Sequence, residues 1–159
     1  MTSDPVRAWA VTEEVLIAAA PKTVFDFFVD PLLMQTWMGD LAVLEPQAGG
    51  VFQVDIGRNR ARGTYVEVKA PERVVFTWGW EGSEAVPPGS STVTFTFEPS
   101  GEGTLLRMVH EGLSAEESTR HRHGWLHYLG RLAVVAPGGD PGPDPHAVDG
   151  DMPLHESQS

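Results

Sequence analysis

Apolar residues recur with the period of an α-helix between Ser114 and Ala136. The resulting stripe consists of Trp125, Leu129, Leu132 and Ala136, with Leu126 and Ala133 beside it. Ser114 followed by Glu117 is a capping-box pattern that marks a helix start, and Pro137 with the glycines after it favours a helix end. The pattern predicts one long helix near the C-terminus, whose apolar stripe has to be buried against another layer.

The chain before this helix alternates between apolar and polar residues in several short segments. Such period-two alternation is typical of strands with one buried face. We also predict two short helices after the first strand, one opening at Pro21 and one at Asp30-Pro31, because proline is favoured in the first helical turn. The basic segment 57–63 and the polar segment 82–91 are predicted to be loops. We predict strands at residues 9–18, 41–45, 51–56, 64–69, 73–80, 92–97 and 104–110.

The order of these elements predicts an α+β fold class. Strands in hairpin order with helices gathered on one face form a curved antiparallel sheet wrapped around the long C-terminal helix. We expect a flexible N-terminus at residues 1–8 and a single domain at residues 9–136. Residues 137–159 are rich in Gly, Pro and Asp and poor in large apolar groups, which predicts a disordered acidic tail.

Composition narrows the class of protein further. The chain has 159 residues, of which 41% are hydrophobic, enough for one domain with a core. It has no cysteine, which excludes disulfides and thiol catalysis. Its net charge of −11 disfavours nucleic acid and anionic membranes as partners, since both require a basic surface. Because it has no apolar run of roughly 18 residues and no secretory signal pattern, we expect a cytoplasmic protein.

The predicted strand and helix faces place a set of large side chains between the sheet and the long helix. An apolar wall with a few polar groups is typical of a pocket for a hydrophobic ligand, although residues at these periods also form ordinary packed cores. The candidate ligand-binding residues are Phe28, Met34, Trp37, Trp78, Trp80, Phe95, Met108, His110, His121, Trp125 and Leu129.

Histidines supply the candidate polar chemistry of this interior. His110 shares a strand face with Met108, and His121 precedes Trp125 by one helical turn. At such a place, an imidazole can orient the polar end of a ligand or transfer a proton near neutral pH. His123 and His127 have a spacing that can hold zinc, but no third ligand is evident. The chain contains no nucleophile, phosphate-loop or dinucleotide motif, so we expect no metal, no cofactor and no assigned catalytic residue.

Several short motifs follow one another along the chain in a distinctive order. They are Pro21-x-x-Val24-Phe25, Gly49-Gly50-x-Phe52, Gly63-x-Tyr65-x-Glu67-Val68, Ala70-Pro71-Glu72-Arg73-Val74-Val75-Phe76-x-Trp78, Val93-x-Phe95-x-Phe97-Glu98-Pro99, His110-Glu111-Gly112-Leu113 and Gly124-Trp125-x-x-Tyr128-Leu129. This ordered set resembles the START-like (SRPBCC) superfamily, over roughly residues 10–135. Within it, the chain is similar to the branch related to the C-terminal domain of the activator of heat-shock-protein-ninety ATPase. This resemblance implies a helix-grip fold with a cavity between sheet and helix, and binding of a hydrophobic small molecule.

Three functions follow as hypotheses. The first is a protein that binds a hydrophobic or aromatic small molecule, with His110 as a polar contact. The second is a cyclase- or hydrolase-like enzyme in which His110 or His121 transfers a proton. The third is a co-chaperone-like or regulatory module that binds protein through the outer sheet face. The sequence leaves both a monomer and a homodimer open.

Overall fold

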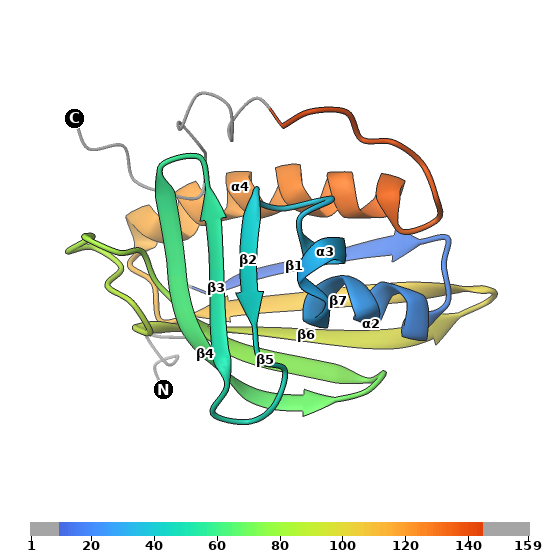
Figure 1. The fold of residues 1–159 in the computed structure, drawn as a ribbon, viewed down its shortest axis with the longest axis horizontal. Coiled ribbons are helices and arrows are strands. Elements are labelled where there is room, and N and C mark those ends of the chain that lie inside the picture. The colour runs from blue at the N-terminus through green and yellow to red at the C-terminus, as the bar shows by residue number, and fades with distance from the viewer. Residues whose placement is uncertain (1–9, 145–159) are drawn as a thin grey trace, which may run out of the picture.

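The computed structural model describes residues 10–144, which form a seven-stranded antiparallel sheet with one long helix against it (Figure 1). This confirms the predicted α+β class, the two short helices after the first strand and the long C-terminal helix. In chain order the elements are β1 (Val11–Ile17), α2 (Pro21–Val29), α3 (Pro31–Met34), β2 (Leu41–Leu44), β3 (Val51–Ile56), β4 (Asn59–Lys69), β5 (Arg73–Trp78), β6 (Ser91–Ser100), β7 (Gly103–Glu111) and α4 (Ala115–Val135).

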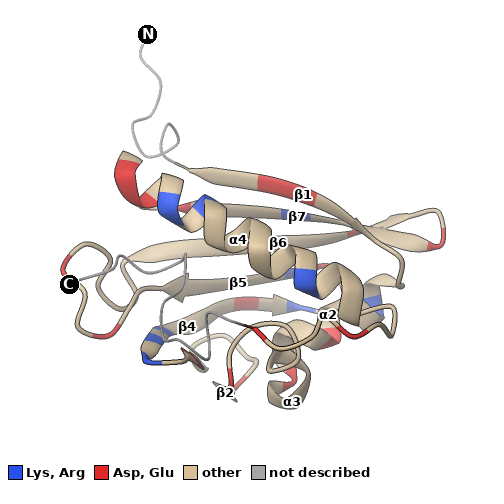
Figure 2. Cartoon of the chain, turned by 90° about the horizontal axis from the view of Figure 1, so that it is seen from above, with Lys and Arg blue, Asp and Glu red and all other residues tan. Residues whose placement is uncertain are grey.

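The sheet runs in the order β1-β7-β6-β5-β4-β3-β2, so the N-terminal strand closes one edge against the last strand. In that pair Val11 lies opposite His110. The sheet is strongly bent, because β2, β3 and the first part of β4 run steeply across the direction of the other strands (Figure 1). Seen from above, α4 lies across the face formed by β1, β7, β6 and β5 (Figure 2). The core therefore lies between α4 and the inner face of the sheet.

The local signals at the ends of α4 act as predicted. The side chain of Ser114 accepts a hydrogen bond from the backbone N–H of Glu117 at 3.1 Å, which satisfies one of the free donors of the first turn. At the other end, Gly139 donates its N–H to the carbonyl of Val134 at 2.9 Å. Most of the predicted stripe is buried, whereas Leu126 is 52% exposed and belongs to the solvent face.

The basic segment 57–63 is mostly strand, and its prediction as a loop was wrong. Only Gly57 and Arg58 turn the chain, and β4 begins at Asn59, paired with Ile56. Two of its arginines, Arg60 and Arg62, have acidic partners, which the linear pattern does not reveal. Arg62 donates to Asp55 on β3 at 2.9 Å, and part of its charge is thereby neutralised within the sheet.

Residues 137–144 of the predicted tail turn back and run along α4 (Figure 1). Arg131 donates to the carbonyl of Pro141 at 3.4 Å, and the hydroxyl of Tyr128 donates to Asp144 at 2.6 Å. The predicted flexible N-terminus, residues 1–8, and the rest of the predicted tail, residues 145–159, lie outside the described residues. Within residues 10–144, no helix combines the length and apolar character needed to cross a membrane.

The fit of β4 against β5 depends on a glycine. A Cβ atom at Gly63 would overlap the backbone carbonyl of Thr77. We expect Gly63→Ala to lower the free energy of unfolding by about 1–3 kcal/mol, the usual cost of overpacking. Gly130 on α4 has open space around it, so Gly130→Ala should raise stability by up to about 1 kcal/mol. Urea unfolding of both variants checks this prediction, and a Gly63→Ala variant as stable as the parent would contradict it.

Candidate functional site

The structure brings all the predicted interior residues together between the sheet and the helices. Each of them is at most 3% exposed. The aromatic and aliphatic members belong to one continuous core cluster. Helices supply Phe28, Met34, His121, Trp125 and Leu129, strands supply Trp78, Phe95, Met108 and His110, and the segments after α3 and β5 supply Trp37 and Trp80.

The aromatic rings of this interior contact one another from α2 to the far end of β5. Phe28 and Phe95 have ring centroids 4.5 Å apart, and Phe95 lies 5.7 Å from Trp125. The ring centroids of Trp125 and Trp78 are 5.3 Å apart, and those of Trp78 and Trp80 are 5.1 Å apart. These separations and the tilted or edge-on geometries are those of favourable aromatic pairs.

The rings fill the space in which a cavity was expected. Trp78, Phe95 and Trp125 have no exposed surface, and Trp80 has 1%. No water-sized void therefore adjoins these described side chains. The physical reason is the size of the indole rings, which span the distance between β5 and α4. A ligand in this space has to displace a side chain that now occupies it.

A chain of hydrogen bonds runs through the aromatic interior around His110. The indole Nε1 of Trp125 donates to His110 Nδ1 at 3.0 Å. His110 Nε2 therefore carries the proton of the neutral ring and donates to Ser91 Oγ at 2.8 Å. Ser91 Oγ in turn donates to the carbonyl of Trp78 at 2.8 Å. Every side-chain polar atom in this series of hydrogen bonds has a partner.

His121 makes the equivalent arrangement with Trp80. The Trp80 indole Nε1 donates to His121 Nε2 at 3.2 Å. His121 Nδ1 then donates to the carbonyl of Glu117 at 2.8 Å and lies 3.5 Å from the Glu117 carboxylate. That carboxylate also accepts from Arg120 at 2.8 Å. The acidic first turn of α4 thus holds the imidazole in the tautomer that accepts from Trp80.

The imidazole of His121 lies close enough to that of His110 to influence its charge. Their ring centroids are 5.2 Å apart, with the ring planes perpendicular. Burial lowers the pKa of His110 well below its usual value, and the nearby His121 lowers that pKa further. The neutral form of His110 is also the form that can accept from Trp125. Electrostatics and hydrogen bonding therefore favour the same protonation state.

Trp78 differs from the other tryptophans of this interior. Its indole Nε1 is buried and has no hydrogen-bond partner. The ring lies in the centre of the cluster, 6.1 Å from His110 and within aromatic contact of Trp80 and Trp125. A buried donor without an acceptor is rare in folded proteins and indicates an incomplete site or a packing cost.

Sequence reasoning missed two polar members of the site. Ser91 was assigned to the polar loop before β6, yet it continues the inward face of Val93 and Phe95 with period two. This alternation was a usable signal. Glu117 was recognised only as part of the cap, and nothing in the linear sequence indicated that its carboxylate is buried beside His121.

The two histidines on α4 whose spacing can hold zinc, His123 and His127, lie in different environments. His127 Nε2 lies 3.1 Å from Asp144, while His123 lies on the exposed face of α4. Within residues 10–144, no group of three or more potential metal-binding side chains comes together.

The chain is similar to proteins of one family. The family model described as activator of Hsp90 ATPase homolog 1-like protein matches residues 18–136. Among curated proteins, no relative reaches a significant match.

Solved structures support the same relationship. An AHSA1-like protein from Rhizobium etli is 48% identical, with a TM-score of 0.69 and 86% of each chain covered. DynU16, a putative protein in the dynemicin biosynthetic locus, is 25% identical with a TM-score of 0.73, and the match covers 87% of this chain and 49% of DynU16. The Aha1 dimer from Colwellia psychrerythraea is 13% identical with a TM-score of 0.71, covers 82% and 97% of the two chains, and shows similarity of fold alone.

Stability should depend on pH through His110. In the unfolded chain, a histidine takes up a proton near pH 6.5, whereas the buried His110 resists protonation. Lowering the pH from about 7 to 5 therefore favours the unfolded chain, with a slope of up to about 1.4 kcal/mol per pH unit for one group. We expect His110→Gln, which keeps a donor and an acceptor, to reduce this slope.

The matched control is His123→Gln, the same substitution on the exposed face of α4. Urea unfolding at several pH values between about 5 and 7 measures the effect while most carboxylates stay ionised. Equal slopes for the two variants would show that His110 is not the group responsible.

Proposed function

Because the chain belongs to the family of activator of Hsp90 ATPase homolog 1-like proteins, we propose that it binds a hydrophobic or aromatic small molecule between its sheet and α4. The apolar composition of the interior supports this proposal. Aromatic rings and the two adaptable methionines, Met34 and Met108, surround a small number of polar groups. Those polar groups then determine which ligand the interior accepts.

The position of Trp80 carries the proposal. Its ring packs on Trp78 and its N–H donates to His121, so it is a built-in aromatic occupant of the interior. Trp80 lies beyond the end of β5 and is joined to the sheet by an isolated bridge to Ala61. The other wall tryptophans on β5 and α4 lie within regular elements. Rotation of the Trp80 side chain would make room without breaking a strand or a helix.

In the proposed bound state, the ligand takes the place of the Trp80 indole. A flat aromatic molecule would then stack among Trp78, Trp125 and His121. Displacing Trp80 also removes its hydrogen bond to His121 Nε2, so a ligand hydroxyl or N–H would restore that bond. The interior therefore favours a ring of indole size that carries one donor.

Binding accounts for the histidines better than proton transfer does. Both ring nitrogens of His110 are engaged, one by Trp125 and one by Ser91. A general base needs a nitrogen within hydrogen-bond reach of a substrate proton. The cyclase- or hydrolase-like alternative would require this satisfied network to break first. The similarity to a protein from a biosynthetic locus is in keeping with a small-molecule partner for either alternative.

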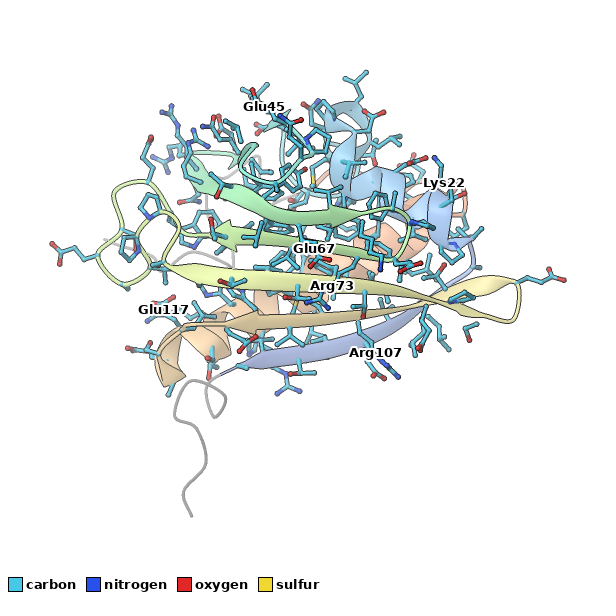
Figure 3. All side chains as sticks on the ribbon, turned by 90° about the horizontal axis from the view of Figure 1, so that it is seen from below. Lys22, Glu45, Glu67, Arg73, Arg107 and Glu117 are labelled. Atoms are coloured by element: carbon cyan, nitrogen blue, oxygen red, sulfur yellow. The ribbon has the colours of Figure 1, made fainter. Side chains whose placement is uncertain are left out.

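The outer face of the sheet is less suited to a protein partner in its middle part. Figure 3 looks onto this face, where Glu67 and Arg73 lie close together. The nitrogen Nε of Arg73 is 3.0 Å from Glu67, and Arg107 is 2.7 Å from Glu14. Three threonines of β6 alternate with the inward residues of that strand. The regulatory module, a homodimer and a cytoplasmic location remain predictions.

Indole signals in NMR spectra test the proposed place of binding. Among the five tryptophans, Trp37 is the internal reference, since its Nε1 donates to the carbonyl of Phe27 at 3.0 Å and its ring packs on Phe28. Titration with 6-acetyl-2-naphthol should shift the Nε1–H resonances of Trp78, Trp80 and Trp125 more than that of Trp37. An unchanged spectrum at saturating probe would count against binding in this interior.

A variant separates displacement of Trp80 from other modes of binding. Trp80→Phe keeps a ring but has no bond to His121 that the ligand must break. One hydrogen bond is worth about 0.5–1.5 kcal/mol, so we expect affinity for the probe to rise about three- to tenfold. Tyr128→Phe, which removes a hydroxyl donor bonded to Asp144 outside the proposed site, is the matched control and should leave the affinity unchanged. Equal affinities for the parent and Trp80→Phe would contradict displacement of this indole.

A further inference from the structure

The unpartnered indole N–H of Trp78 indicates what kind of ligand the interior takes. Trp78 is on β5, has no exposed surface, and contacts Phe52, Phe76, Trp80 and Trp125 through its ring. Its Nε1 has no acceptor. The other wall tryptophans all donate: Trp37 to Phe27, Trp80 to His121 and Trp125 to His110. This difference singles out Trp78.

The surroundings of Trp78 show that the missing partner has to be an acceptor. Around His110, the imidazole and the hydroxyl of Ser91 satisfy each other and the carbonyl of Trp78. His110 Nδ1 is already occupied by Trp125. The protein therefore offers a donor at Trp78 and supplies no acceptor for it.

The charges near this donor favour an uncharged acceptor. His110 is held in its neutral form, so it provides no positive charge. The carboxylate of Glu117, buried beside His121, already pairs with Arg120 at 2.8 Å, so this cation has its anionic partner within the protein. A buried anion without a cationic partner is costly, whereas a carbonyl oxygen needs only the N–H.

We propose that the ligand is an uncharged aromatic molecule with a carbonyl-type oxygen that accepts a hydrogen bond from Trp78 Nε1. This inference rests on the proposed function and names its ligand class. Trp78 is then the residue that selects ligands with an acceptor oxygen. The surrounding rings contribute affinity whether or not the ligand has that oxygen. A site built to satisfy a polar group discriminates against analogues that leave that group unpaired.

A series of three naphthols tests the proposal. The compounds are 6-acetyl-2-naphthol, 6-ethyl-2-naphthol, which lacks the carbonyl, and 6-hydroxy-2-naphthoic acid, which carries a charged carboxylate. Because all three keep the hydroxyl, differences in affinity report the acceptor alone. With the parent protein, we expect the ketone to bind about five- to tenfold more tightly than the ethyl compound, and the carboxylate more weakly than the ketone.

The variant Trp78→Phe removes the N–H and keeps an aromatic ring. We expect it to bind the ketone and the ethyl compound equally. Tyr128→Phe, which lies outside the proposed site and removes a hydroxyl donor that is already bonded to Asp144, should keep the preference of the parent. If Trp78→Phe fails to fold, the Nε1–H resonance of Trp78 in the parent gives a second measurement. It should move downfield with the ketone and not with the ethyl compound.

The outcomes separate this inference from the proposed function. Equal affinity of the parent for the ketone and the ethyl compound, a preference that persists in Trp78→Phe, or a carboxylate that binds as tightly as the ketone would each overturn the inference while binding itself stands. If none of the three compounds binds, the proposed function fails, and the inference fails with it.

Discussion

The structure depends on burying indole and imidazole rings together between α4 and the sheet. Such rings supply large apolar area, but each also carries polar nitrogen atoms that cannot be left unpaired without cost. The protein meets this constraint by pairing them. Trp125 donates to His110, and Trp80 donates to His121. These bonds favour the neutral form of His110 and tie α4 to β7 and to the segment after β5.

The helices and most of the strands could be predicted because they depend on patterns among neighbouring residues. The N-cap at Ser114 and the inward alternation of β6 each act through neighbouring residues, and both appear as expected. The inward residues of the site were also predictable, since the period of a strand or helix decides which side chains face the core. Trp78 and Trp125 were placed correctly on this basis.

Other features depend on residues far apart in sequence and could not be predicted. Arg62 belongs to a strand in which it lies opposite Gln53, and its side chain reaches diagonally to Asp55 on β3. Whether the rings would leave a cavity depends on the distance between β5 and α4 and on the rotamers of several tryptophans. The segment 137–144 was expected to be disordered from its composition, yet Asp144 accepts from Tyr128. None of these distances is encoded in a local pattern.

Because side chains fill the interior, a ligand can bind there only after one of them moves. Instead of an open cavity, the described residues form a closed state in which Trp80 occupies the space proposed for the ligand. Binding then requires a minor open state, and the measured affinity reflects the population of that state. Such opening is a local event that need not involve unfolding of the strands.

Hydrogen–deuterium exchange of the indole N–H groups in the ligand-free protein tests this account most directly. If the Trp80 side chain opens locally, its Nε1–H should exchange with an opening free energy well below that of global unfolding, while Trp37 and Trp125 exchange only when the whole protein unfolds. Exchange of Trp80 at the same rate as Trp125, under conditions where only global unfolding exposes either, would contradict it.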